Sequence, residues 1–116
     1  MKFVPKFTRD YDQPTRLETS TVLGRRIFEA VRAICPNGQV FHLLTHTIGQ
    51  AEDVLAVLVD TDVVASFELN RLQPEASATE IEVRPVATYR KTVRGLKARE
   101  LKVALEAAAR SRDKPA

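Results

Sequence analysis

The sequence predicts one α+β domain of two layers, with a helix, then an antiparallel sheet of three or four strands, then a C-terminal helix. Apolar residues recur every three or four positions over residues 20–35 and again over 96–112, which is the spacing of a buried helix face. Between them, residues 40–84 hold short β-branched and apolar runs separated by Gly, Asp and Pro, as in strands joined by turns. Hydrophobic residues make up 44% of the 116, enough for one folded core.

The chain divides into an N-terminal arm, one domain and a short tail. Residues 1–16 contain two prolines and no sustained apolar period, so we expect an irregular arm there. The single α+β domain is expected over residues 17–112. Residues 113–116 are expected to fray.

The first helix is expected over residues 20–35. Thr19 or Ser20 can supply the N-cap hydroxyl, and the stretch 36–38, Pro-Asn-Gly, stops the helix. Its outer face then carries three arginines and a glutamate, namely Arg25, Arg26, Arg32 and Glu29.

Four segments of the middle region have strand character. Residues 40–48 lie between two glycines, and residues 54–59 lack polar alternation, as expected of a strand covered on both faces. Residues 63–69 alternate apolar and polar, after an Asp60-Thr61-Asp62 turn. A fourth strand around residues 80–84 has one polar face, and Pro85 ends it or places it at an edge.

The last helix is expected over residues 96–112, rich in good helix formers and starting at Gly95. Its apolar face consists of Leu101, Ala104, Leu105 and Ala108. We expect both helices to cover the same face of the sheet, which leaves the other face open to a partner.

Several functional classes are disfavoured. The longest apolar run, residues 54–59, is far shorter than the roughly 20 residues of a membrane span. The N-terminal residues have no apolar stretch of the kind found in a secretory signal, so none is expected. A lone cysteine, Cys35, predicts a reducing, cytoplasmic setting. Dinucleotide, P-loop and nucleophile-elbow motifs are absent from the sequence, so we expect no cofactor.

Two histidines and the cysteine are the residues most suggestive of chemistry. In a regular strand His42 and His46 lie on one face about 13 Å apart, too far to share a metal ion, so no metal is expected. A small enzyme using either histidine is the least favoured hypothesis. Cys35 falls at a helix C-terminus, where a thiolate is not stabilised, so we expect it to pack as a small apolar residue.

Charge is distributed unevenly along the chain, whose net charge is +3. Residues 50–89 carry a net −6, and residues 90–116 carry a net +6. Within the basic segment, Arg90, Lys91, Arg94 and Lys97 can neutralise phosphates, with Tyr89 stacking on a base. The alternative interpretation is a solvated helix start that complements Glu75, Glu80 and Glu82.

The leading functional hypothesis is a non-enzymatic protein that binds another protein or itself, as a homodimer. It depends on the apolar hairpin of residues 54–69, which two helices need not cover completely. Four residues of this hairpin are the candidate partner interface: Val57, Val59, Val64 and Phe67. Nucleic-acid binding through residues 90–97 is the alternative from a different class.

Overall fold

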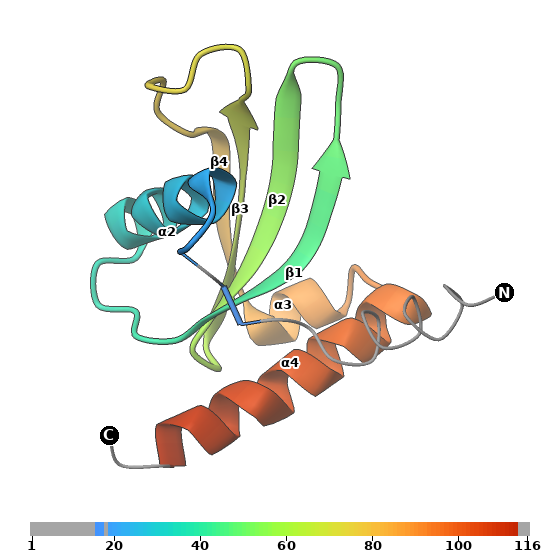
Figure 1. The fold of residues 1–116 in the computed structure, drawn as a ribbon. Helices are drawn as coiled ribbons and strands as arrows, with labels where there is room; N and C mark the ends of the chain where they lie inside the picture. Colours follow the sequence, from blue (N-terminus) through green and yellow to red (C-terminus); the bar gives the residue numbers. More distant parts are fainter. Residues whose placement is uncertain (1–15, 18, 114–116) are drawn as a thin grey trace, which may run out of the picture.

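A computed structural model describes residues 16–17 and 19–113 (Figure 1), so the predicted arm and tail lie almost entirely outside the described residues. The elements in chain order are α2 (Val22–Ile34), β1 (Phe41–Ile48), β2 (Glu52–Val59), β3 (Val63–Asn70), β4 (Thr79–Pro85), α3 (Val86–Arg90) and α4 (Leu96–Asp113). A helix, four antiparallel strands in one open sheet and a C-terminal helix confirm the predicted α+β fold class. None of the described helices is both long and apolar enough to cross a membrane.

The N-cap of helix α2 is Thr21, one residue after the predicted Ser20. The side chain of Thr21, rather than Thr19 or Ser20, accepts a hydrogen bond from the Gly24 N–H at 2.9 Å. The helix ends where Pro36 predicts, and the Gly38 N–H then donates to the Cys35 carbonyl in the turn that leads to β1.

The four strands form a simple meander in the order β1-β2-β3-β4. The β2–β3 turn confirms the role expected of its aspartates: Asp60 has φ 54°, and its carboxylate accepts the N–H groups of Gln39 and Val40. Two irregularities interrupt the ladders. One is a bulge in β1 between Leu43 and Thr45, and the other lies between Ser66 and Glu68 of β3, opposite Glu80.

The helices cover opposite faces of the sheet, which differs from the expected two layers. One core joins Ile27 and Val31 of α2 to β-strand residues such as Phe67. The other joins Tyr89 of α3 and Leu101 of α4 to alternate strand residues. The physical reason lies in β2, whose run from residue 54 to 59 is apolar on both faces, so that each face needs a helix.

The apolar hairpin is therefore the centre of the protein. The four residues expected to form a partner interface are all core residues, with exposed fractions of 0% for Val57, 3% for Val59, 1% for Val64 and 1% for Phe67. Since they are buried under α2 or under α3 and α4, they form no exposed surface in this fold.

Helix α3 is the one described helix that the sequence pattern did not predict. Pro85 ends β4, as expected, and also precedes the first residue of α3. Five residues are too few to show a helical period, so the sequence carries no periodic pattern that would predict α3. Gly95, with φ 59°, then separates this turn from α4, which begins at Leu96 as predicted.

Candidate functional site

Five exposed basic residues lie along α3, the loop that follows it and the first turns of α4. We call this the α3–α4 basic surface, and its members, all exposed, are Arg90, Lys91, Arg94, Lys97 and Lys102. Figure 1 places α3 and α4 next to each other, away from α2. Because Tyr89 and Leu101 anchor the two helices to the sheet, the basic residues beside them face outward.

A hollow of about 360 Å³ lies within this surface. Arg90 lines it from α3, while Ala98, Leu101 and Lys102 line it from α4. The fold thus brings Arg90 and Lys102 to one hollow, although eleven residues lie between them in the sequence. Lys102 was missing from the predicted set, even though the basic run that suggested the site extends to it.

Tyr89 does not take the predicted role beside these cations. Its side chain is 8% exposed and packs in the core with Val86 and Leu101. Burial, together with the nearby Glu100 carboxylate, raises the pKa of the Tyr89 hydroxyl. A ring held in this core cannot stack on a base.

The members of the α3–α4 basic surface form no ion pair with another described residue. The three ion pairs among residues 16–17 and 19–113 are His46–Asp53, Arg71–Asp53 and Arg84–Glu82. Glu82 is therefore engaged within β4, at 2.8 Å from Arg84. Glu75, in the β3–β4 loop, lines a hollow beside α2 on the opposite face of the sheet. These contacts weigh against the expectation that middle-region carboxylates complement the basic segment.

Glu100 is the acidic residue with the closest electrostatic link to this surface. Burial raises the pKa of its carboxyl, while the positive charge of Lys97 lowers it, and the net shift is upward.

The arginines of α2 do not extend the basic surface, because α2 packs on the other face of the sheet. Arg26, expected on the outer face, is half-buried and donates to the Asn70 carbonyl at 2.7 Å, with further bonds to two carbonyls of the β3–β4 loop. Arg32 lies 5.8 Å from the centre of the Phe28 ring. Both have structural contacts of their own.

The β1 bulge separates the two histidines. Its extra residue reverses the alternation, so His42 pairs with Leu58 on the α4 side, whereas His46 pairs with Leu55 on the α2 side. His42 is buried, and its Nδ1 has no hydrogen-bond partner among the described residues. Burial, and secondarily the charge of Arg16, lower the pKa of the His42 ring.

His46 belongs to a cluster with a buried carboxylate. Its Nε2 lies 2.8 Å from Oδ1 of Asp53, which also accepts a bond from Arg71 at 3.1 Å. Burial alone would raise the pKa of Asp53, but the bonds and charges of His46 and Arg71 hold it below its usual value. Arg71 also donates to the carbonyls of Gly49, Gln50 and Glu52, so the cluster fastens the β1–β2 hairpin.

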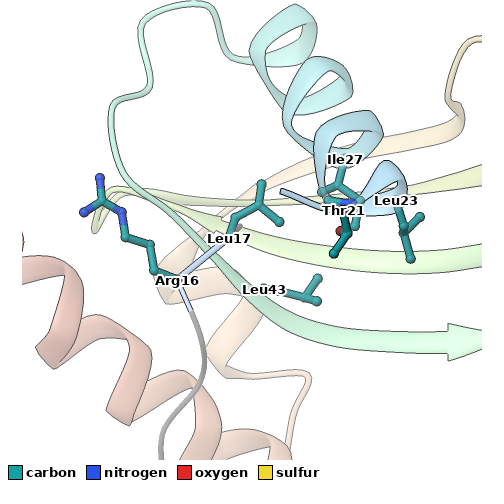
Figure 2. A pocket seen from close by; sticks show the side chains of 7 residues that line it. Arg16, Leu17, Thr21, Leu23, Ile27 and Leu43 are labelled. Carbon is teal, nitrogen blue, oxygen red and sulfur yellow. Dashed lines mark hydrogen bonds between the residues drawn. The ribbon is translucent and has the colours of Figure 1, made fainter. Parts of the chain in front are cut away.

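A small pocket lies between the start of α2 and β1 (Figure 2). It measures about 290 Å³, and its lining is almost wholly apolar, including Leu17, Leu23, Ile27 and Leu43. Figure 2 shows the guanidinium of Arg16 directed away from these side chains. The described residues that line the pocket bring no group of polar atoms together, so they offer little chemistry for binding.

Cys35 is half-buried at the end of α2 and packs against the α2-side core. Burial and the negative charge of Asp60 raise the pKa of its thiol, which suits packing better than nucleophilic attack. Among residues 16–17 and 19–113, no group of three or more His, Cys, Asp or Glu side chains could hold a metal ion.

Comparison with protein families, curated proteins and solved structures gives no significant match to this chain.

Proposed function

We propose that this protein binds the phosphate backbone of a nucleic-acid duplex through the α3–α4 basic surface. The observation that carries the proposal is the run of five exposed Lys and Arg residues over α3 and the start of α4, with no ion-pair partner among the described residues. Basic side chains that neutralise phosphates release condensed counterions, which drives binding without sequence-specific contacts.

The dimensions of α4 suit such a ligand. At about 1.5 Å per residue its 18 residues extend roughly 27 Å. A duplex carries one phosphate charge per about 1.7 Å of its axis, counting both strands, so a surface of this length meets several phosphates. The hollow between Arg90 and Lys102 offers a concave point of contact within this length.

A duplex is favoured over a single strand because α3 and α4 carry no exposed aromatic side chain on which a base could stack. Proteins that bind single strands place aromatic side chains against successive bases. Tyr89 is the aromatic residue of α3 and α4, and it is buried. We therefore propose contacts to phosphates alone, with little preference for sequence.

Fluorescence anisotropy with a labelled duplex of about 20 base pairs, at about 50 and 200 mM salt, tests the proposal. The variant Arg94→Glu/Lys97→Glu should weaken binding at least about tenfold and lower the slope of log K against log salt by about 2. The matched control is Arg25→Glu/Arg32→Glu, which changes the net charge equally on the opposite face and should bind almost as tightly as the wild type.

Three results would overturn the proposal. The first is no binding by the wild-type protein at the lower salt concentration. The second is an equal loss in both double variants, which would indicate net charge rather than a site. The third is tighter binding to a single strand than to the duplex.

The hypothesis of protein association needs a different surface from the one the sequence predicted, because Val57, Val59, Val64 and Phe67 are buried. Strand β4 offers such a surface, since all its residues except Arg84 are exposed.

A further inference from the structure

Strand β4 is an open edge of the sheet. It pairs with β3 on one side, and no strand of the described residues lies on its other side. Ile81 is 52% exposed and Val83 is 44% exposed, which is unusual for apolar residues of a strand. We infer that β4 pairs with β4 of a second copy, antiparallel and centred on Val83, to give one sheet of eight strands.

The backbone of β4 has the hydrogen-bonding groups that this pairing requires. The Val86 N–H donates to the Asp62 carbonyl at 3.0 Å, which fixes the alternation of bonded pairs along β3 and β4. By that alternation Arg84 and Glu82 exchange bonds with β3, whereas the N–H and C=O of Val83 are directed toward the open side. Two copies centred on Val83 can therefore exchange these bonds reciprocally.

The charges of β4 favour the same register. With Val83 opposite the partner's Val83, Glu82 lies opposite the partner's Arg84, and the reverse pair repeats across the two-fold axis. Glu82 and Arg84 of one chain are already 2.8 Å apart. The four charges would then alternate in sign on one face of the joined sheet, which stabilises cross-strand neighbours.

Neighbouring registers place like charges opposite each other. Centring the pair on Glu82 brings it against the partner's Glu82, and centring it on Ile81 brings Glu80 against the partner's Glu82. Charged residues and a proline on an edge strand usually discourage pairing with other chains. Here alternating signs discourage the wrong registers and leave one that is complementary. In that register Ile81 faces the partner's Pro85, so apolar residues also meet.

The pairing has a consequence that rests on the proposed function. An antiparallel pair within one continuous sheet is related by a two-fold axis perpendicular to the sheet. That axis keeps both α3–α4 basic surfaces on the same face of the dimer. Two such surfaces on one face would bind a single duplex more tightly than either alone.

Sedimentation velocity across about 1–100 µM protein, without nucleic acid, tests the pairing by charge reversal. Arg84→Glu should weaken dimerisation roughly tenfold or more, as should Glu82→Arg, because each creates like-charge contacts. The double variant Glu82→Arg/Arg84→Glu restores alternating charges and should restore the dimer. Glu29→Arg, at an exposed position of α2, is the control and should leave the dimer intact, and circular dichroism melts confirm that every variant is folded.

A monomeric wild-type protein at the highest concentration would overturn the inference. So would a folded double variant that fails to recover dimerisation, because only the register centred on Val83 predicts recovery. Failure here is distinguishable from failure of the proposed function. Duplex binding by a monomer would retain the α3–α4 site and reject the pairing, whereas a charge-sensitive dimer that ignores duplexes would do the opposite.

Discussion

Replacing Arg71 by alanine should destabilise the fold, because this side chain is one of two partners of a buried carboxylate. Asp53 has a side chain 3% exposed, and it accepts bonds from Arg71 at 3.1 Å and from His46 at 2.8 Å. The same guanidinium reaches three carbonyls of the β1–β2 hairpin, the shortest contact being 2.6 Å to Gly49. Truncating Arg71 therefore removes a charge partner of Asp53 and, at the same time, the side-chain bonds to the backbone of the hairpin.

The size of the effect follows from burial. Breaking a fully buried ion pair costs about 3–5 kcal/mol, because a charge is left without compensation. The Arg71 side chain is 35% exposed, so water can replace part of its contact, and screening reduces the loss. We expect Arg71→Ala to lower the free energy of unfolding by about 2 kcal/mol, which corresponds to a fall in Tm of roughly 10 °C.

Urea unfolding at neutral pH, followed by circular dichroism, measures this change. Arg71→Lys, which keeps the charge but loses the planar fork, should give an intermediate loss. Arg25→Ala is the matched control, because its hydrogen bond to the Thr19 carbonyl is long and exposed, at 3.4 Å. An Arg71→Ala protein within about 0.5 kcal/mol of the wild type would refute the reasoning, since that is the ordinary range for surface substitutions.

The remaining predictions concern the two cores. Burial lowers the pKa of His42 in the folded state below its usual value of 6.5. As the pH falls, the unfolded chain therefore binds a proton at a higher pH than the folded protein does. The free energy of unfolding should accordingly decrease as the pH drops below about 6.5. His42→Gln should flatten this dependence between pH 7.5 and 5.5 in urea titrations, and an unchanged slope would contradict the assignment. Phe67→Ala should lower the free energy of unfolding by about 3–5 kcal/mol, because the ring is 1% exposed. Unchanged stability with altered self-association would instead favour the interface role that the sequence suggested.

Local signals account for the parts of the fold that the sequence predicted. Pro36 ends α2, Gly95 precedes α4, and Asp60 forms the hairpin turn, each through a backbone preference of the residue itself. The apolar face of α4 was also correct, since Leu101, Ala104 and Ala108 are all buried. Each of these features depends on residues within a few positions along the chain.

Features that depend on pairing between distant segments were not predictable in this way. The bulge near Leu44 requires no glycine, and yet it reverses the faces of every residue that follows in β1. That single insertion places His42 and His46 on opposite sides of the sheet. The burial of Tyr89 depends likewise on α3, which is too short to leave a periodic pattern.

The basic residues illustrate why the candidate site emerged only in three dimensions. Along the sequence the arginines look alike, but Arg26 and Arg71 donate to backbone carbonyls, and Arg84 pairs with Glu82. These three guanidinium groups are therefore held by contacts within the protein. The members of the α3–α4 basic surface have no such contacts among the described residues, so their positive charge faces solvent. A net charge of +3 therefore understates the attraction for an anion on this face, because cations and carboxylates elsewhere largely compensate one another.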